Sequence, residues 1–360
     1  MKRAIALASL GLRKTSPNPI VGCVIVKDGR IIGEGWHKQY GGPHAEIEAI
    51  NDAKSHNEDV SGSTVYVTLE PCSHYGKTPP CADRLIREGV AEVVIAMTDP
   101  NPQVNGKGIE ILRNAGIKVT DLAAFRAEAT RLNKGFFCVQ EYHRPCVTIK
   151  AAMSLDGKMC LANGSSKWIT GKLARIQTHK LRAENDAVIV GSGTVLADDP
   201  ELTVRHVKGI NPLRIVLDTK LKTPPTAKII GTDGKCLIIA GTKADKTKQS
   251  LLEEAGAEVV RMPYFGARID LNFVVKYLAE RGILNLMVEG GPAVISAFVR
   301  ERLVDCATIF TAPRILGEGK GFNLKMNCED VEHAYRLVLI KTTMLGQDIM
   351  TEGLLKCSPD

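Results

Sequence analysis

The sequence lacks any hydrophobic run that could cross a membrane. Of its 360 residues 44% are hydrophobic, yet no stretch approaches the ~18 uninterrupted apolar residues that a spanning helix needs. The chain opens with basic and then apolar residues, but that run ends at Arg13 and Lys14 without a small-residue cleavage site. We therefore expect no membrane partner, no signal peptide and a cytoplasmic protein. A helix is predicted from residue 2 onward, so we expect almost no leader before it.

Aromatic side chains and blocks of like charge are also scarce. Aromatic residues make up 5% of the chain, and its 47 basic and 40 acidic residues give a net charge of +7 without a run of five like charges. Nucleic-acid-binding proteins gather basic charge on one face and stack bases on aromatic platforms. We therefore expect no nucleic-acid partner, and the mild basic excess suits a small phosphorylated ligand. The alternative, a zinc-stabilised nucleic-acid-binding or editing protein, would bind RNA or DNA in a salt-sensitive manner.

The chain contains ten cysteines, most of them in apolar runs where cysteine behaves as a small core residue. Without a secretion signal we expect them to be reduced. Cys72 and Cys81 differ, because they lie in a polar, proline-rich loop.

Hydrophobic periodicity predicts two α/β domains, at 1–143 and 144–360, with a boundary near the EYHRP segment at 141–145. In the first domain, helices and strands alternate around one sheet with helices on both faces. Its predicted helices are 2–13, 44–54, 81–88 and 108–115, and its predicted strands are 20–27, 63–69, 92–97 and 117–120.

The second domain repeats this alternation. Predicted strands are 146–152, 187–191, 214–218, 235–240, 258–261, 284–289, 306–311 and a terminal 336–343, and predicted helices are 171–184, 245–255, 270–280 and 292–301.

One histidine and two cysteines of the first domain form a zinc-binding pattern. His44 opens a predicted helix, Cys72 follows a strand, and Cys81 begins the next helix, where the helix dipole favours a thiolate. Three protein ligands with an open fourth position are typical of catalytic zinc. A purely structural zinc is the alternative, and His74 is a rival ligand.

Glu46 lies two residues beyond His44, where it can sit beside the metal without binding it. A carboxylate there can take a proton from water and pass it to a ring nitrogen and a leaving amine. The pattern H-x-E followed by P-C matches the zinc deaminase signature, although the second cysteine comes nine residues after the first instead of three. The residues therefore predict hydrolytic deamination of a heterocycle.

Five further segments of the first half carry a resemblance: 16–19 (SPNP), 21–26 (VGCVIV), 43–46 (PHAE), 68–72 (TLEPC) through 79–81 (PPC), and 99–102 (DPNP). They resemble the bifunctional deaminase/reductases of riboflavin biosynthesis, in which the long loop between the cysteines is usual. The resemblance implies a three-layer cytidine-deaminase-like zinc domain followed by a dihydrofolate-reductase-like α/β domain. It implies that the deaminase substrate is a diaminopyrimidinone with a phosphoribosylamino group. It further implies that the deaminase pocket is lined by Asn18, His74, Lys77, Thr78, Asn101 and Asn105.

In the second half, a predicted strand runs into Gly290, Gly291 and Pro292 and then a helix. Such a turn can approach a phosphate, but it is also an ordinary tight turn. The segments 150–157 (KAAMSLDG), 166–170 (SKWIT), 191–200 (GSGTVLADDP) and 202–205 (LTVR) resemble the reductase half of the same family, which uses NADPH.

That resemblance implies two sets of contacts. The residues expected at the cofactor are Ala152, Trp168, Thr194, Asp198, Gly291, Pro292, Ala293, Val294, Ile295, Ser296 and Ala297. The residues expected at the substrate are Lys150, Ser166, Arg182, Leu202, Arg205 and Glu289. The two arginines offer fixed forks for a phosphate, and Glu289 could bind ribityl hydroxyls.

The resulting hypothesis is an enzyme that deaminates the ring and then reduces the ribosyl C1′ with NADPH. A single-activity zinc deaminase with a non-reducing second domain is the alternative. The resemblance also suggests a homo-oligomer, with a dimer favoured.

Overall fold

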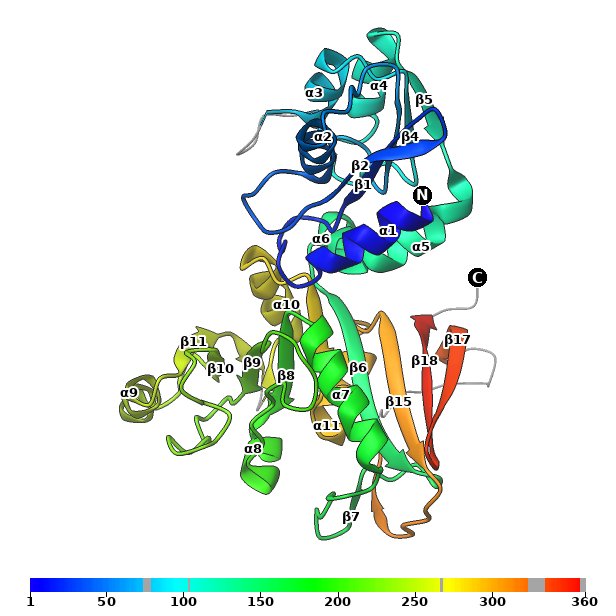
Figure 1. Ribbon diagram of the computed structural model, residues 1–360. Helices are drawn as coiled ribbons and strands as arrows, with labels where there is room; N and C mark the ends of the chain where they lie inside the picture. Colours follow the sequence, from blue (N-terminus) through cyan, green and yellow to red (C-terminus); the bar gives the residue numbers. More distant parts are fainter. Residues whose placement is uncertain (74–78, 103, 266–267, 323–333, 357–360) are drawn as a thin grey trace. The chain divides into compact units, whose positions relative to one another are not determined.

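A computed structural model of the chain describes residues 1–73, 79–102, 104–265, 268–322 and 334–356 (Figure 1). It divides into two compact units, Met1–His143 and Arg144–Asp360. Among the described residues, no helix has the length and hydrophobicity needed to span a bilayer.

The first unit is built on a five-stranded sheet with the order β2-β1-β3-β4-β5. β1 pairs antiparallel with both β2 and β3, whereas β3, β4 and β5 run parallel. The strands are β1 (Gly22–Lys27), β2 (Arg30–Trp36), β3 (Thr64–Val67), β4 (Glu92–Ile95) and β5 (Lys118–Asp121).

Strand β2 is not among the predicted elements, although the Asp-Gly pair before it is typical of a hairpin turn. Asp28 and Gly29 join β1 to β2, and both have positive φ angles, of 50° and 75°. This is the backbone that a tight two-residue hairpin requires. Gly33 and Gly35 weaken the strand pattern, which concealed β2 in the sequence.

Helices cover both faces of this sheet and make three layers (Figure 1). On one face, α2, α3 and α4 pack apolar side chains such as Ile50, Leu85 and Leu112 against Ile25 and Val65. The opposite face packs against α1 and α5. The helices are α1 (Lys2–Ala8), which continues as a 3₁₀ turn (Ser9–Gly11), α2 (Ala45–Ser55), α3 (Cys81–Arg87), α4 (Lys107–Asn114), α5 (Arg126–Leu132) and α6 (Lys134–Tyr142).

The first helix ends earlier than predicted. The periodicity predicts helix through residue 13, but the α-helix stops at Ala8 and Arg13 has a φ of 67°. The backbone at Arg13 is therefore left-handed, which a continuous helix cannot accommodate.

The glycines of β2 allow α2 to lie unusually close to the sheet. A Cβ at Gly35 would come within 2.3 Å of the Ala49 backbone nitrogen and 2.5 Å of the Ala45 carbonyl oxygen. Any larger residue would push this helix away from the sheet. The spacing matters because α2 carries His44 at its start and Glu46 in its first turn.

The second unit is built on a nine-stranded sheet with the order β11-β10-β9-β8-β14-β6-β15-β18-β17. Its first seven strands in this order run parallel, and only β18 and β17 are antiparallel to their neighbours. The strands are β6 (Cys146–Ser154), β8 (Ala187–Gly191), β9 (Leu213–Leu217), β10 (Cys236–Gly241), β11 (Glu258–Met262), β14 (Asn285–Val288), β15 (Cys306–Ala312), β17 (Arg336–Leu345) and β18 (Asp348–Lys356). Four short strands form two small separate ribbons: β7 (Cys160–Leu161) with β16 (Gly319–Lys320), and β12 (Tyr264–Phe265) with β13 (Arg268–Ile269).

Both faces of this sheet are buried under helices. Ile189 packs in a core with α10 and α11, while its neighbours Val188 and Val190 pack in a second core with α7, α8 and α9. Parallel strands covered on both faces read as continuous apolar runs, as the sequence shows here. The helices are α7 (Lys172–Glu184), α8 (Ser192–Asp198), α9 (Lys246–Glu254), α10 (Leu271–Glu280) and α11 (Pro292–Arg300).

The predicted terminal strand is one arm of a hairpin. β17 turns through Gly346, whose φ is 72°, and returns as β18 to pair with β15. The sequence pattern did not reveal β18, because Met350 is buried while Ile349 and Leu354 are exposed.

Candidate functional site

The first site begins at the start of α2. His44 occupies the N-cap position with φ −75° and ψ 166°, but its side chain makes no capping hydrogen bond. Its imidazole points instead toward two sulfurs: Nδ1 lies 3.5 Å from Cys72 Sγ and 3.3 Å from Cys81 Sγ. His44 therefore directs its side chain to the cysteines and not to the backbone of its own helix.

The two cysteines meet because one follows a strand and the other begins a helix. The backbone N–H of Cys81, the first residue of α3, donates to Cys72 Sγ at 3.3 Å, and the N–H of Ala82 donates to the Cys72 carbonyl oxygen. Hydrogen bonding by the Cys81 thiol and by His44 lowers the pKa of the Cys72 thiol well below its ordinary value. Cys81, as the donor of that pair, has a raised pKa.

The donor atoms of His44, Cys72 and Cys81 all lie within 4.8 Å of one another. Zinc bonds of 2.0–2.3 Å in a tetrahedron place neighbouring ligand atoms roughly 3.6 Å apart. Nitrogen and sulfur are also the donors that zinc prefers. The geometry and chemistry of the three side chains therefore fit a zinc ion with one open coordination position.

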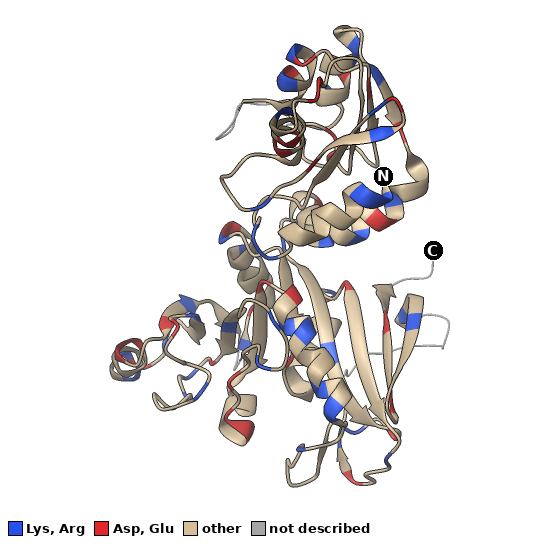
Figure 2. Ribbon diagram, viewed as in Figure 1, with Lys and Arg blue, Asp and Glu red and all other residues tan. Residues whose placement is uncertain are grey.

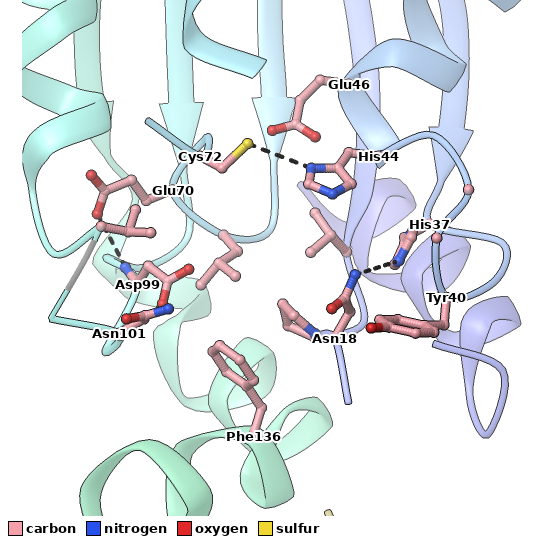
Figure 3. Close-up of a pocket in the computed structure, with 16 residues that line it drawn as sticks. Asn18, His37, Tyr40, His44, Glu46, Glu70, Cys72, Asp99, Asn101 and Phe136 are labelled. Atoms are coloured by element: carbon pink, nitrogen blue, oxygen red, sulfur yellow. Dashed lines mark hydrogen bonds between the residues drawn. The ribbon is translucent and has the colours of Figure 1, made fainter. Parts of the chain in front are cut away.

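Glu46 lies beside this cluster in the first turn of α2 and is 3% exposed (Figure 3). Burial, together with the negative charge of Cys72, raises the pKa of Glu46 to about 7. A carboxyl group in this range can both accept and donate a proton near neutral pH.

The cluster opens into a pocket that lies wholly in the first unit. Figure 3 shows Cys72, His44 and Glu46 at one side of the cavity and Phe136 at the other. The residues that line it are Asn18, Pro19, Val21, His37, Tyr40, Gly41, Gly42, His44, Glu46, Leu69, Glu70, Cys72, Asp99, Asn101, Val104 and Phe136.

The structure brings Asn18 and Asn101 to the pocket, as the resemblance implies. Asn105, by contrast, is exposed and is not among the lining residues. His74, Lys77 and Thr78 fall outside the described residues, so their expected contacts stay predictions.

A buried carboxylate holds the loop that carries Asp99 and Asn101. Glu70 accepts hydrogen bonds from the backbone N–H groups of Asp99, Gly106, Gly108 and Ile109, at 2.9–3.3 Å. At Gly108 a Cβ would lie only 2.0 Å from the Pro71 carbonyl oxygen. Glu70 therefore ties the pocket loop to the segment that carries Cys72.

The orientation of the Asn18 side chain is set by His37, which is 3% exposed. His37 Nδ1 lies 2.9 Å from the Pro43 carbonyl oxygen, so this nitrogen carries the proton, and its Nε2 accepts from Asn18 Nδ2 at 3.2 Å. The amide oxygen of Asn18 is then left to accept a hydrogen bond from a ligand.

The second site centres on a buried group of charges. Arg182 on α7 donates from Nε and Nη2 to the two carboxylate oxygens of Glu289, at 2.8 and 2.7 Å, and from Nη1 to the Thr203 carbonyl oxygen. Lys150 Nζ on β6 lies 3.7 Å from Glu289 Oε1. Although burial opposes ionisation, the charges of Arg182 and Lys150 lower the pKa of Glu289 to about 2.

The expected substrate residues thus divide into two groups. The fork of Arg182 is directed at Glu289, whereas Arg205 has a side chain that is 43% exposed. The Arg205 backbone N–H donates to His179 Nδ1 at 3.1 Å, which joins this segment to α7. Leu202, which is 4% exposed, lies in the same segment.

The expected cofactor residues gather where β6, β8 and β14 end. Such carboxyl-end edges are where ligands bind in open α/β sheets. Thr194 Oγ1 accepts from the Gly291 backbone N–H at 3.1 Å, which joins α8 to the turn before α11. In that turn Pro292 is the first helical residue.

The 291–297 segment, which is Gly291 and the first six residues of α11, is not open to a ligand along its whole length. Ile295 and Ser296 are 0% and 2% exposed, whereas Ala293 is exposed. These two residues therefore offer a ligand almost no accessible surface, and the Ile295 backbone N–H already donates to the Gly291 carbonyl oxygen.

The remaining expected residues lie near α8 or on β6. Ser166 Oγ is 3.4 Å from both carboxylate oxygens of Asp198. Trp168 is 62% exposed and stacks with the Arg175 guanidinium, which lies 4.6 Å from the ring centroid. Ala152 lies on β6, two residues beyond Lys150.

Sequence reasoning missed several of these residues. Glu70 and Asp99 belonged to motifs already singled out, so their positions were available. His37, Phe136 and His179 carried no local signal, since each reaches its site only through the fold.

Comparison with known proteins matches both units. Residues 1–97 match the family described as cytidine and deoxycytidylate deaminase zinc-binding region, and residues 145–351 match the RibD C-terminal domain.

Full-length relatives match as well. The riboflavin biosynthesis protein RibD of Aquifex aeolicus is 44% identical over 97% of this chain and 96% of its own length. That of Escherichia coli is 39% identical over 97% of this chain and 96% of its own.

Solved structures agree with these sequence matches. One structure of Acinetobacter baumannii RibD superposes with a TM-score of 0.87 at 38% identity, covering 99% of this chain and 97% of that one. The diaminohydroxyphosphoribosylaminopyrimidine deaminase/5-amino-6-(5-phosphoribosylamino)uracil reductase of Thermotoga maritima gives a TM-score of 0.87 at 37% identity, covering 99% and 97%. The chain therefore belongs to the RibD family of bifunctional deaminase/reductases of riboflavin biosynthesis.

Proposed function

We propose that each unit performs one of the two reactions, with 1–143 as the deaminase and 144–360 as the reductase. The chain deaminates 2,5-diamino-6-(5-phosphoribosylamino)pyrimidin-4(3H)-one and then reduces the ribosyl group of 5-amino-6-(5-phosphoribosylamino)uracil. Its cofactors are zinc for the first reaction and NADPH for the second. The observation that carries the deaminase assignment is the buried Glu46 carboxyl beside the His44, Cys72 and Cys81 donors in one pocket.

In the deaminase unit, His44, Cys72 and Cys81 would hold zinc, and the metal would supply a water acidified for attack on the ring carbon that carries the amine. Glu46 takes one proton from the attacking water and delivers it to the adjacent ring nitrogen. It then takes the proton of the new hydroxyl group on the ring carbon and delivers it to the leaving amine. Ammonia leaves and the ring carbon becomes a carbonyl. Asn18 and Asn101 orient the pyrimidine, with His74, Lys77, Thr78 and Asn105 as the further contacts that the family resemblance implies.

In the reductase unit, NADPH would supply a hydride to the ribosyl C1′, whose bond to the sugar-ring oxygen breaks as that oxygen takes up a proton. Arg205, with its exposed guanidinium, binds the substrate phosphate, and Ser166 and Leu202 complete the substrate contacts. Glu289, fixed by Arg182 and Lys150, accepts hydrogen bonds from sugar hydroxyls. The cofactor would lie along Ala152, Trp168, Thr194, Asp198 and the 291–297 segment at the start of α11.

Crossed variants test this division of labour. Glu46→Gln should lower ammonia release by about 10²–10⁴-fold with zinc still bound and with reduction of supplied intermediate intact. Arg205→Ala should raise the KM of reduction and leave deamination unchanged. If Glu46→Gln keeps its deaminase activity, the zinc is structural; if no NADPH is consumed by the wild type, the chain is a single-activity deaminase.

We further propose that the chain forms a homodimer through β17. Three apolar side chains of this edge strand, Leu339, Ile340 and Met344, are 80%, 59% and 62% exposed. Exposed apolar patches on an edge strand are typical of association surfaces. Sedimentation should give a dimer for the wild type and a monomer for Leu339→Lys; a monomeric wild type would contradict the proposal. We place the enzyme in the cytoplasm, where its two thiol ligands stay reduced.

A further inference from the structure

Asn133 stands at the junction of α5 and α6 but does not cap either helix. It follows the last residue of α5 and occupies the N-cap position of α6, where asparagine usually accepts hydrogen bonds from its own helix. No such capping bond is present. The side chain is buried, with 3% of the residue exposed, and it reaches a distant segment instead.

That segment is Ile20. Asn133 Oδ1 accepts from the Ile20 backbone N–H at 2.7 Å, and Asn133 Nδ2 donates to the Ile20 carbonyl oxygen at 2.8 Å. The carboxamide thus supplies both bonds that a neighbouring strand would give, just before β1 begins at Gly22. It acts across 113 residues of sequence.

Ile20 directly follows two residues that line the deaminase pocket. Asn18 and Pro19 both line that pocket, and the Asn18 amide is oriented there by His37. Fixing the backbone at Ile20 therefore fixes where Asn18 enters the cavity.

The opposite wall starts from the same junction. Phe136 lies three residues after Asn133 on α6, lines the same pocket, and is 6% exposed. Figure 3 shows its ring projecting from the helix into the cavity opposite the zinc donors. The backbone next to Asn18 and the helix that carries Phe136 are therefore both positioned from one buried carboxamide, that of Asn133.

We propose that Asn133 is a positioning residue for pyrimidine binding, which sets the Asn18 wall of the pocket against Phe136. This inference rests on the proposed deaminase function of the first unit. The helical segment that carries Asn133 and Phe136 lies after the zinc-binding region, which ends at residue 97, and before the RibD C-terminal domain, which begins at 145. The segment therefore adds a substrate-shaping wall to the zinc centre without supplying a zinc ligand.

The test compares Asn133→Asp and Asn133→Ala with the matched control Asn114→Asp. Asn133→Asp preserves shape and the acceptor but places an oxygen against the Ile20 carbonyl. Asn114 is an exposed asparagine at the end of α4, so the same chemical change there should leave the deaminase KM unchanged. We expect Asn133→Asp to raise the deaminase KM about 10-fold or more with kcat within about 3-fold, because uniform binding is lost.

A double-mutant cycle with Asn18→Ala separates positioning from a general structural role. If Asn133 acts through Asn18, adding Asn133→Asp to Asn18→Ala should raise KM by no more than about 3-fold further. Zinc content and reductase activity, measured on the same preparations, should match the wild type.

Three results would overturn the inference: an unchanged KM in Asn133→Asp, multiplicative effects in the cycle, or loss of zinc and folding in both Asn133 variants. Failure of the proposed function looks different, because the wild type itself would then release no ammonia.

Discussion

The two sites of this chain are assembled in opposite ways. In the first unit the reactive groups come from short motifs, His44 with Glu46 and Cys72 with Cys81, placed at helix starts and a strand end. In the second unit the central pair, Arg182 and Glu289, is separated by 107 residues and meets only through the sheet. A metal site can therefore be predicted from the spacing of its ligands in the sequence, whereas a buried charge cluster has almost no characteristic spacing.

Charged residues in general do not reveal the second site. Figure 2 shows basic and acidic residues distributed over the helices and loops of both units. What distinguishes Glu289 is its placement after β14, whose neighbours in the sheet are β8 and β6. The side chain is thereby enclosed between Lys150 on β6 and Arg182 on α7.

Metal removal should separate the two sites most completely. Stripping zinc with a chelator should abolish ammonia release, because Glu46 then has no activated water to deprotonate. NADPH oxidation with supplied intermediate should continue at the wild-type rate. Loss of both activities on chelation, restored together by zinc, would show that the sites are not independent.

Breaking the charge cluster should be the next largest effect. Glu289→Gln leaves Arg182 and Lys150 buried without their counter-charge, and we expect about 3–5 kcal/mol of destabilisation of the second unit. The matched control is Glu258→Gln, which breaks the surface pair of Arg281 and Glu258 and should cost about 0–1 kcal/mol.

Urea unfolding of both variants measures this difference in stability, with the loss of reductase activity as the signal for unfolding of the second unit. Equal costs in the two variants would mean that burial of the cluster adds nothing.

In each unit a carboxylate side chain holds a loop by accepting backbone hydrogen bonds. We expect the two carboxylates to stabilise their units to different degrees. Glu70 is buried and accepts four backbone N–H groups, whereas the exposed Asp156 accepts those of Leu316 and Gly317. Glu70→Gln should cost about 1–3 kcal/mol, since an amide leaves buried N–H groups unpaired, and should raise the deaminase KM. Asp156→Asn should have a smaller effect on the reductase KM, and a larger effect there would reverse the ranking.

A further effect should appear as a pH dependence of the second unit. Burial, and then the charges of Arg182 and Arg205, lower the pKa of His179 to about 4 from an unfolded value of about 6.5. The unfolded chain therefore binds a proton between these values that the folded chain does not, so stability falls as the pH drops from about 6.5 to about 4.

Glu289, with a pKa of about 2 against about 4.3 unfolded, extends the same loss to lower pH. Unfolding midpoints measured from pH 7 to pH 4 should decline for the wild type and flatten for His179→Gln. Matching slopes in both proteins would exclude His179 as the cause.

Much of the fold could be predicted from the sequence, because its parallel strands are apolar runs and most helices carry a clear 3.6-residue period. The exceptions have separate causes. β2 contains two glycines required by the close approach of α2, and β18 has apolar residues on both faces. Helices α5, α6 and α8 are short and were not recognised by periodicity.

The zinc donors could be predicted for a physical reason: three soft ligands and one carboxyl must come from a few residue types at restricted spacings. The rest of the pocket could not, since His37, Glu70 and Phe136 contribute through contacts that depend on the tertiary fold. Asn133 is the clearest case, because it occupies the N-cap position of α6 in the structure and its side chain instead holds Ile20.

The central claim is that one chain carries two separate and sequential chemistries. It is tested most directly by supplying the diaminopyrimidinone ribotide and following ammonia release and NADPH absorbance in one reaction. The account predicts ammonia release first and NADPH oxidation after it. Glu46→Gln should remove both signals, with NADPH oxidation restored by supplied intermediate, whereas Arg205→Ala at limiting substrate should weaken NADPH oxidation alone. Ammonia release without NADPH oxidation would contradict the assignment of the second unit as a reductase. The absence of both signals in zinc-loaded protein would contradict the proposed substrate.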